Sequence, residues 1–441
     1  MISEITPEVI ETIKNPKFKA YASMYQTLYD KFIASVEAVG LAIDPYDDRA
    51  EMTARRAHLA SKGAVVRNDG KSVYVNWISP SCEACQTGLG MATLFLSLKC
   101  HRQCFFCFNP NQEDYAYYTE NARDCMRELE LIYASGARLE HIGLTGGEPL
   151  LHKAETVRFF RYARERFPDA RTRLYTSGDF LDQEILEELQ QARLNEIRIS
   201  IRLADAEPAR RHTLDQLALA KAYVPDVMVE MPVLPDSREE MKQLLLELDR
   251  LEIRGINLLE FCFPMRNAQV YSDKGYRIRH RPYRVPYNYE YAGGLPIAGS
   301  EAACLDLVEF AIDQRLNLGA HYCSVENKHT GEVYQHSYER KIPPQLSISH
   351  RDYFLKSAKV FGKDIPKVMQ VFDQIGYTGF EVNRQHHYLE FRVDQIKHLA
   401  ALDVQVALST SLTEERPDGE YLRELQVGLT TPQTFEMATD A

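Results

Sequence analysis

The sequence predicts an α/β protein built around a partial (β/α)6-type, TIM-like barrel, with an N-terminal helical segment and a C-terminal α+β extension. Two observations carry this prediction. Short apolar runs alternate with segments of helical apolar spacing from residue 92 to residue 261. The alternation is absent from the first 62 residues, and it is lost again after Glu326. We therefore expect one central barrel with additions on both sides.

The N-terminal residues 7–61 are predicted to be helical, with a break at Gly40. Apolar side chains recur there at helical spacing, at Tyr21, Tyr25, Leu28, Phe32, Val36 and Val39. The following segment, 64–78, has a different pattern. Two short runs of β-branched residues flank Asn68-Asp69-Gly70, which favours a strand, a tight turn and a second strand.

Six β/α units are expected between residues 92 and 261. The predicted strands cover 92–98, 141–144, 173–176, 196–201, 226–233 and 255–261. The predicted helices cover 124–133, 154–167, 181–192, 213–223, 237–252 and 300–314, and a further strand is expected within 316–323. Such alternation is typical of parallel strands covered by helices, and a barrel of this kind carries its chemistry on the loops that follow the strands.

We accordingly divide the chain into three parts: an N-terminal helical segment (1–62), a barrel with its preceding hairpin (63–330) and a C-terminal accessory domain (331–441). A barrel of about 250 residues with additions accounts for the 441 residues. The sequence assigns no function to the first and third parts.

Composition and charge narrow the classes of partner. The chain has 63 acidic and 52 basic residues, a net charge of -11, which makes nucleic acid an unexpected partner. No apolar run approaches the roughly 20 residues that span a bilayer, so no membrane contact is expected. The N-terminus lacks the basic start and apolar centre of a signal peptide, and we expect a cytoplasmic protein. In this reducing compartment the 9 cysteines indicate metal binding or catalysis rather than a disulfide framework.

Three of these cysteines follow the first barrel strand on one loop. Cys100, Cys104 and Cys107 have the spacing C-x3-C-x2-C. Thiolates so close in sequence can converge on one soft centre, such as an iron–sulfur cluster or zinc. A four-iron cube takes four ligands, so this loop would leave one iron open. A zinc knuckle or a chance cluster of cysteines is the alternative.

This loop resembles the signature of radical S-adenosylmethionine (SAM) enzymes, and the aromatic Phe106 before the last cysteine also matches that family. The resemblance implies a [4Fe–4S] cluster on Cys100, Cys104 and Cys107, whose open iron binds the amino and carboxylate groups of SAM. Electron transfer then cleaves SAM to methionine and a 5′-deoxyadenosyl radical, which abstracts hydrogen from a substrate. A reducing partner of the flavodoxin or ferredoxin type is implied as the electron donor.

A second match follows the strand 141–144. It is the sequence Thr145-Gly146-Gly147-Glu148-Pro149, and the resemblance implies that Gly146, Gly147 and Glu148 hold the amino group of SAM. Glycines at a strand end also let a ligand approach the backbone closely.

Later strand ends give further family matches. They imply a contact of Ser177 with the SAM ribose, and SAM contacts of Ser200 and Arg202 on the fourth strand. Arg202 is expected to pair with the SAM carboxylate, with Arg198 as its competitor. The fifth strand ends in Val233-Leu234-Pro235, which departs from the family's frequent glycine-rich ending and leaves the adenine contact unassigned.

A further pair, Cys82 and Cys85, has the C-x2-C spacing of half a metal site. The remaining ligands could come from Cys262, Cys304 or Cys323. Cys323 is the first choice because it stands nearest a predicted strand end. The pair therefore predicts an auxiliary iron–sulfur cluster or zinc site, with free thiols as the alternative. No cysteine follows Cys323, so the cysteine-rich C-terminal extension of many family members is absent.

The remaining cysteines have simpler interpretations. Cys125 and Cys304 lie within apolar helical patterns and are expected to be buried small hydrophobes. No catalytic residue can be assigned from the sequence. Cys262 follows the sixth strand and is the candidate hydrogen donor to a product radical, with a packing role as the alternative.

A long segment, 265–299, follows the sixth strand and is rich in tyrosine and arginine. Its tyrosines are Tyr271, Tyr276, Tyr283, Tyr287, Tyr289 and Tyr291. Such residues suit recognition of a polymer or an acidic segment, and a self-packed excursion is the alternative.

The leading hypothesis is therefore a radical SAM enzyme acting on a peptide or protein, as in maturation of a ribosomally made precursor (RiPP-type maturation). The alternatives are modification of a small metabolite, activation of a glycyl-radical enzyme and a non-catalytic metal-binding scaffold.

Overall fold

The structure is a computed structural model, and it describes residues 2–282 and 294–437. These residues form two compact units, which we call the barrel unit (39–282 and 294–331) and the sheet unit (2–38 and 332–437). The predicted N-terminal helical segment is divided between them. Helices α1 (Pro7–Thr12) and α2 (Pro16–Glu37) belong to the sheet unit, whereas α3 (Arg49–Ser61) belongs to the barrel unit.

The barrel unit contains one nine-stranded sheet with the order β2-β3-β12-β9-β8-β7-β6-β5-β4. Its parallel strands are β4 (Met91–Phe95), β5 (His141–Thr145), β6 (Arg171–Thr176), β7 (Glu196–Ile199), β8 (Asp226–Val233), β9 (Gly255–Glu260) and β12 (Gly319–Cys323). The hairpin of β2 (Val65–Arg67) and β3 (Ser72–Val75) extends this sheet, with β3 antiparallel to β12. Among the described strands β4 and β2 are the two edges and do not pair, so the barrel is open.

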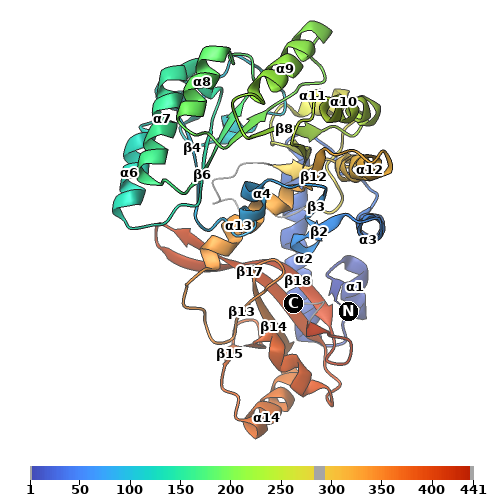
Figure 1. The fold of residues 1–441 in the computed structure, drawn as a ribbon. Helices are drawn as coiled ribbons and strands as arrows, with labels where there is room; N and C mark the ends of the chain where they lie inside the picture. The colour runs from blue at the N-terminus through green and yellow to red at the C-terminus, as the bar shows by residue number, and fades with distance from the viewer. Residues whose placement is uncertain (1, 283–293, 438–441) are drawn as a thin grey trace. The chain divides into compact units, whose positions relative to one another are not determined.

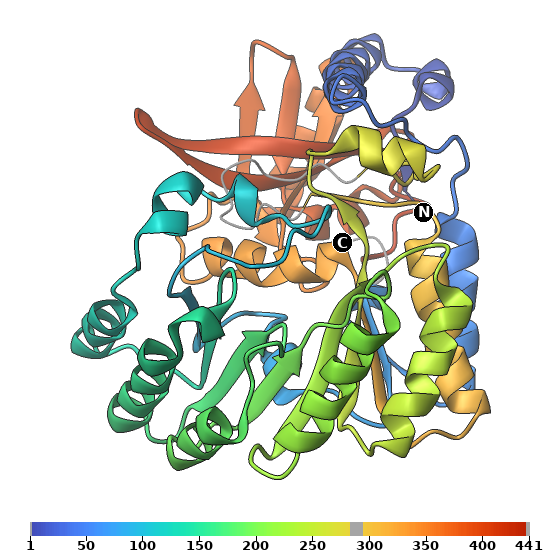
Figure 2. The same ribbon diagram turned by 90° about the horizontal axis from the view of Figure 1, so that it is seen from above.

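Helices cover the outer face of this sheet (Figures 1 and 2). They are α6 (Cys125–Ala134), α7 (Lys153–Arg166), α8 (Gln183–Gln191), α9 (Glu207–Ala220), α10 (Arg238–Arg250) and α12 (Ser300–Asp313). Fully buried apolar side chains such as Leu174, Ile197 and Phe160 fill the layer between strands and helices. This arrangement confirms the predicted partial β/α barrel, and β12 adds a seventh parallel strand to the six expected units.

Shorter elements complete the barrel unit. They are α4 (Pro80–Ala84), α5 (Tyr115–Glu120), α11 (Ala268–Asp273), β10 (Cys262–Phe263), β11 (Leu295–Pro296) and the 3₁₀ turns η1 (Asn68–Gly70), η2 (Asn109–Asn111) and η3 (Pro149–His152). Helix α13 (Val325–Ser337) follows β12 directly and was not predicted. Figure 1 shows α4 beside α13, and a Cβ on Gly331 of α13 would lie only 2.6 Å from the carbonyl oxygen of Cys85.

The sheet unit is an antiparallel α+β structure, as predicted for the C-terminal part. Its strand order is β1-β18-β17-β14-β16-β15, and β13 also pairs with β14. The strands are β1 (Ser3–Glu4), β13 (Ser347–Ile348), β14 (Leu355–Phe361), β15 (Phe380–Asn383), β16 (Tyr388–Phe391), β17 (Val406–Arg416) and β18 (Gly419–Thr430). Helix α14 (Ile365–Ile375) and the turns η4 (Gly362–Asp364) and η5 (Val393–Leu399) complete it.

The N-terminus is part of this sheet unit. Strand β1 pairs with β18, and the ring of Phe18 on α2 stacks on Phe361 with 4.8 Å between ring centroids. Lys359 is buried beneath α2, where its Nζ lies 3.1 Å from the hydroxyl oxygen of Tyr21 and 2.6 Å from Oε1 of Glu424. The first helices and the last strands thus share one core. No helix in the described parts of the chain has the length and apolar character needed to cross a membrane.

Candidate active site

The cysteine loop after β4 is held by backbone hydrogen bonds to the turn that follows β5. The N–H of Gly147 donates to the carbonyl oxygen of Ser97 (3.0 Å), and the N–H of Glu148 donates to that of Lys99 (2.8 Å). On the other side of the three cysteines, Nδ2 of Asn109 donates to the carbonyl oxygen of Gly146 over 2.8 Å. Both ends of the loop are therefore attached to the same Gly-Gly-Glu turn.

The two glycines are required for this attachment. Gly146 has a φ of +131°, and a Cβ there would overlap the carbonyl oxygen of Ser97. A Cβ on Gly147 would overlap the carbonyl oxygen of Lys99. Any larger residue would push the turn and the cysteine loop apart. The close approach expected of these glycines occurs, and in this structure it is made to the chain's own loop.

Glu148 ties the ends of two strands together. Its carboxylate is 1% exposed and accepts hydrogen bonds from the hydroxyl of Thr176 (2.7 Å), the N–H of Ser177 (2.7 Å) and the N–H of Leu150 (3.0 Å). A carboxylate has about four acceptor positions, so one remains for a further donor. The predicted contact of Glu148 with the SAM amino group stays a prediction.

Arg102, inside the cysteine loop, joins it to the loops after β6 and β7. Its guanidinium donates two hydrogen bonds to Asp179, of 2.5 and 2.6 Å, and one of 3.2 Å to Asp205. His101 contacts the same Asp179 carboxylate. Burial alone would raise the pKa of Asp179, but the hydrogen bonds from Arg102 and His101 outweigh it and lower that pKa to about 2.

A third set of contacts reaches the cysteine loop from the turn after β10. Nδ2 of Asn267 donates to the carbonyl oxygen of Phe105 (2.8 Å), and Nδ2 of Asn111 donates to that of Pro264 (2.6 Å). Sequence reasoning missed these residues and the Arg102–Asp179 pair, because their partners are remote in the chain and no local spacing signals them. The loop is therefore positioned by four neighbouring loops, those after β5, β6, β7 and β10.

Aromatic rings pack behind the cysteines. Phe106 meets Phe105 edge to face with 5.1 Å between centroids, and Phe261 at 6.0 Å. Tyr271 is fully buried and stacks on Phe261. Phe106 thus helps to fix the loop, while its predicted cofactor contact stays a prediction.

The chemistry of the three loop cysteines fits a cluster. All are free thiols, with Cys100 exposed and Cys104 and Cys107 half-buried. Burial raises the pKa of Cys100 and of Cys107. The N–H of Arg102 donates to Sγ of Cys100 (3.4 Å), which favours the thiolate of Cys100, and Nη1 of Arg202 lies 3.8 Å from Sγ of Cys104.

A single-ion site is a poorer fit. Among the described residues no three His, Cys, Asp or Glu side chains are grouped closely enough to hold one metal ion. Zinc requires all its ligands at about 2.0–2.3 Å from one centre. A four-iron cube binds each thiolate through a different iron, so its cysteines stand farther apart. A [4Fe–4S] cluster therefore demands less convergence of the three thiols than zinc does.

The other predicted SAM ligands differ in how far their side chains are buried. Ser177 is buried beside Asp179, whose N–H lies 3.4 Å from its Oγ. Ser200 is exposed and donates to the carbonyl oxygen of Glu230 (3.1 Å). Arg202 pairs with Asp205 at 2.7 Å and reaches the cysteine loop, whereas Arg198 lies inside the barrel. Their SAM contacts stay predictions, and the position of Arg202 favours it over Arg198.

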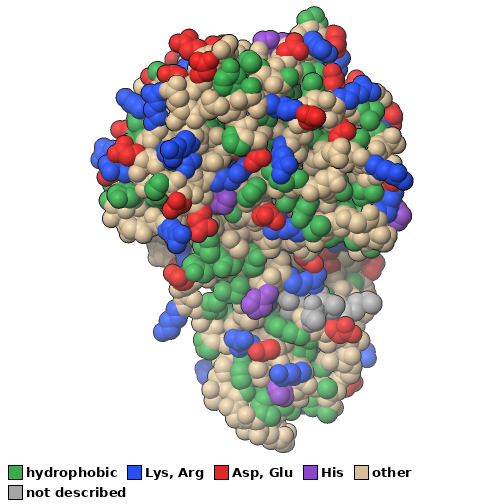
Figure 3. All heavy atoms as spheres, viewed as in Figure 1, with side chains coloured by type: hydrophobic (Ala, Val, Ile, Leu, Met, Phe, Trp, Pro, Cys, Tyr) green, Lys and Arg blue, Asp and Glu red, His purple; other side chains and the backbone are tan. Residues whose placement is uncertain are grey.

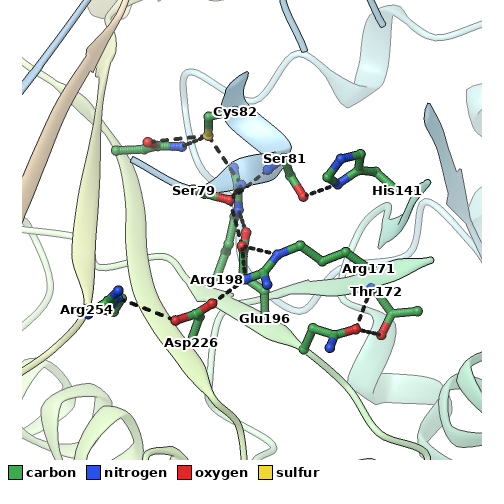
Figure 4. A network of polar contacts seen from close by, with 12 residues as sticks. Ser79, Ser81, Cys82, His141, Arg171, Thr172, Glu196, Arg198, Asp226 and Arg254 are labelled. Atoms are coloured by element: carbon green, nitrogen blue, oxygen red, sulfur yellow. Dashed lines mark hydrogen bonds and ion pairs between the residues drawn. The ribbon is translucent and has the colours of Figure 1, made fainter. Parts of the chain in front are cut away.

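The interior of the barrel holds a polar network (Figure 4). Arg198 is 4% exposed and donates to Glu196 (2.6 Å), Glu230 (2.6 Å) and Ser79 (3.2 Å), and its Nη2 lies 3.3 Å from Sγ of Cys82. Of the predicted auxiliary ligands, Cys82 belongs to this network, Cys85 follows α4, and Cys323 ends β12. Their metal-binding role stays a prediction.

The predicted hydrogen donor Cys262 is half-buried on β10, and burial raises its pKa to about 11. Its catalytic role stays a prediction.

In the segment 265–299, Tyr271 and Tyr276 are buried, so this part packs against the barrel. Arg279 pairs there with Glu260 (2.9 Å) and Glu301 (2.6 Å). Four tyrosines expected to recognise a polymer lie outside the described residues: Tyr283, Tyr287, Tyr289 and Tyr291.

Surface charge does not gather into a basic patch on the face seen in Figure 3, where lysine and arginine side chains are interspersed with acidic ones. An extended basic surface is the usual footprint of a nucleic-acid partner.

Comparison with known proteins agrees with this site. Residues 94–248 match the family model of the radical SAM superfamily, and this range contains the cysteine loop and the Gly-Gly-Glu turn. This match agrees with the predicted resemblance to radical SAM enzymes, a superfamily that uses S-adenosylmethionine and a [4Fe–4S] cluster.

Two curated relatives match parts of the chain. One, from Methanocaldococcus jannaschii, is named "Putative glycyl-radical enzyme activating enzyme" and is 28% identical over 256 residues, which cover 55% of this chain and 62% of the relative. The other is the PqqA peptide cyclase of Granulibacter bethesdensis, 29% identical over 116 residues, which cover 26% of this chain and 30% of that protein. The chain thus spans less than two thirds of each relative.

A solved structure is similar over a longer range. Streptococcus suis SuiB bound to its precursor peptide SuiA has a TM-score of 0.41 and 12% identity, with 73% of this chain and 67% of that chain covered.

Proposed function

We propose that this protein is an enzyme that reductively cleaves SAM and abstracts hydrogen from a peptide or protein. The observation that carries the proposal is the attachment of the cysteine loop to the Gly-Gly-Glu turn through Gly147 and Glu148. This attachment brings the three thiols of one strand end next to the turn that the family uses for SAM.

We assign the following roles to residues of this chain. Cys100, Cys104 and Cys107 hold the [4Fe–4S] cluster, which supplies the electron for SAM cleavage when it is bound and reduced. Arg202, at the cysteine loop, pairs with an anionic group of SAM. Arg102 and Asp179 hold the loop in place, and the aromatic rings of Phe105, Phe106 and Phe261 keep water from its inner side.

A polypeptide substrate has two lines of support. The names of both relatives refer to a polypeptide target, a peptide in one case and an enzyme in the other. The 265–299 segment is rich in tyrosine and arginine, and its Asn267 contacts the cysteine loop. RiPP-type maturation is our first choice. Activation of a glycyl-radical enzyme is the second, favoured by the Methanocaldococcus jannaschii relative. A small metabolite is the third.

The proposal includes a cellular setting. Cluster reduction requires a low-potential donor, for which a flavodoxin or ferredoxin is suitable. Nine free cysteines suit a reducing compartment, so we propose a cytoplasmic location.

SAM cleavage tests the proposal. The full chain would be reconstituted anaerobically with iron and sulfide, reduced with dithionite and assayed for 5′-deoxyadenosine by liquid chromatography. We expect product from the wild type and from Cys125→Ser, a control at a buried cysteine of α6, and none from Cys104→Ser. Absence of 5′-deoxyadenosine in the wild type, with a full complement of cluster, would refute the proposal.

The substrate class needs a second assay. Peptides encoded by short reading frames beside the gene would be added to the reduced enzyme and analysed by mass spectrometry. A peptide that loses two hydrogens or gains a cross-link supports the maturase. A glycyl radical doublet in the electron paramagnetic resonance (EPR) spectrum of a neighbouring enzyme supports activation instead.

A further inference from the structure

A second group of cysteines lies outside the cysteine loop. Cys82 and Cys85 belong to the α4 segment, and Cys323 ends β12. Two of them accept N–H···S contacts of 3.3 Å. Sγ of Cys82 accepts from Nη2 of Arg198 and from Nδ2 of Asn257. Sγ of Cys323 accepts from Nδ2 of Asn327. Such donors stabilise thiolates and tune cysteine-bound metal centres.

The three cysteines come from two distant parts of the chain that lie against each other. Helix α13 starts two residues after Cys323, and its Gly331 lies against the backbone of Cys85. Nδ2 of Asn257 contacts Sγ of Cys82, and Oδ1 of the same Asn257 lies 2.6 Å from Nδ1 of His321, two residues before Cys323 on β12. A glycine at 331 is needed for the approach, because a Cβ would lie 2.6 Å from the Cys85 carbonyl oxygen.

The barrel interior also contains a buried arginine that forms no ion pair with a carboxylate among the described residues. Arg173 is 5% exposed, and its Nε and Nη1 have no hydrogen-bond partner among the described residues. Its one hydrogen bond goes to the hydroxyl of Thr93 (3.0 Å). Its neighbours Arg171 and Arg198 are both paired with Glu196. An unpaired buried guanidinium costs several kcal/mol, so an anionic group in this interior would offset that cost.

We propose that Cys82, Cys85 and Cys323 hold a second iron–sulfur cluster inside the barrel, with Arg173 and Arg198 balancing its negative charge. Nη2 of Arg198 lies 3.3 Å from Sγ of Cys82, and the guanidinium groups of Arg173 and Arg198 lie 5.7 and 5.2 Å from the ring centroid of the same Tyr175. A cluster fits better than zinc for the reason given for the loop: no three described ligands converge on one ion. Three thiolates leave one iron for another ligand.

This second cluster does not depend on the proposed function, because its iron and sulfide can be measured in a variant that lacks the loop cluster. The variant Cys100→Ser/Cys104→Ser/Cys107→Ser removes the loop ligands and leaves the interior unchanged. After anaerobic reconstitution of the full chain, iron and acid-labile sulfide are measured per chain and the clusters are typed by Mössbauer spectroscopy.

We expect about eight irons in the wild type and about four in this loop variant. The variant Cys82→Ser/Cys85→Ser/Cys323→Ser should also hold about four, and the sixfold variant none. Cys304→Ala, at a fully buried cysteine of α12, is the control and should retain both clusters. Circular dichroism verifies that each variant is folded.

A milder substitution tests the site with all cysteines in place. In the loop variant, Arg173→Gln should retain its iron but move the midpoint potential to a more negative value, because a positive charge beside the cluster favours its reduced form. Three results would overturn the proposal: a folded loop variant with no iron–sulfur signal, stoichiometric zinc in place of iron, or a Cys82–Cys85 disulfide under the reconstitution conditions.

Discussion

The backbone N–H of Glu148 donates a 2.8 Å hydrogen bond to the carbonyl oxygen of Lys99, the residue before the first cysteine of the loop. Two family signatures that are about 40 residues apart in the sequence are thus in direct contact. The Gly-Gly-Glu turn has a structural role that exists before any cofactor binds, since it sets where the loop begins.

Gly147→Ala should disrupt this contact. The added Cβ would overlap the Lys99 carbonyl oxygen, so the loop must shift or the turn must open. We expect the reconstituted variant to lose most of its loop cluster, measured by iron content in the Cys82→Ser/Cys85→Ser/Cys323→Ser background. Gly136→Ala, which strains a backbone φ of +80° but meets no atom within 4 Å, controls for a general loss of stability. Full cluster content in Gly147→Ala would show that the contact is dispensable.

The Arg102–Asp179 pair predicts a pH dependence of apo-protein stability. The pKa of Asp179 is lowered to about 2 in the folded chain, from an ordinary value of 3.8. The pair therefore stabilises fully above about pH 4, and this contribution, about 2 kcal/mol, disappears as the pH falls towards 2. In Asp179→Asn the difference from wild type in free energy of unfolding, followed by urea titration, should shrink over that interval. A difference that is constant with pH would contradict the assignment.

Asn267 should affect SAM cleavage more than cluster assembly. Its side chain makes one hydrogen bond to the loop, at Phe105, and a bond of this kind contributes about 1 kcal/mol. We expect Asn267→Ala to retain the cluster and to form 5′-deoxyadenosine about fivefold more slowly. Gln269→Ala, an exposed neighbour on α11, is the matched control. Equal rates in both variants would remove Asn267 from the positioning residues.

Lys359 should dominate the stability of the sheet unit. Its ammonium is buried and lies beside Glu424 and Glu390, so its loss leaves two carboxylates in the core. We expect Lys359→Ala to destabilise this unit by about 3–5 kcal/mol. Thermal unfolding measures the effect, and the exposed Lys363→Ala should change it little. A loss below about 1 kcal/mol would mean that water reaches these carboxylates.

Local pattern predicted the barrel and the cysteine loop, but it could not predict long-range pairing. The β/α alternation and the C-x3-C-x2-C spacing are properties of neighbouring residues, and both are found where they were expected. The pairing of Ser3 with Leu429 joins opposite ends of the chain through a two-residue strand, which leaves no signal in the sequence. Asn267 and Phe105, 162 residues apart, were missed for the same reason.

The cysteines Cys82, Cys85 and Cys323 could be predicted only in part from local sequence patterns. The C-x2-C spacing made Cys82 and Cys85 candidate ligands, and the predicted strand end made Cys323 the third candidate. The unpaired guanidinium of Arg173 gave no sign in the sequence, because an arginine within a strand is ordinarily solvated or paired. The structure was needed to place this charge beside the thiols.

The EPR spectrum of the reduced full chain, recorded with and without SAM, tests the central claim most directly. We predict the signal of a reduced [4Fe–4S] cluster that changes on addition of SAM, persists in Cys82→Ser/Cys85→Ser/Cys323→Ser and is lost from Cys104→Ser in that background. A signal that ignores SAM, or that survives without Cys100, Cys104 and Cys107 in that same background, would contradict it.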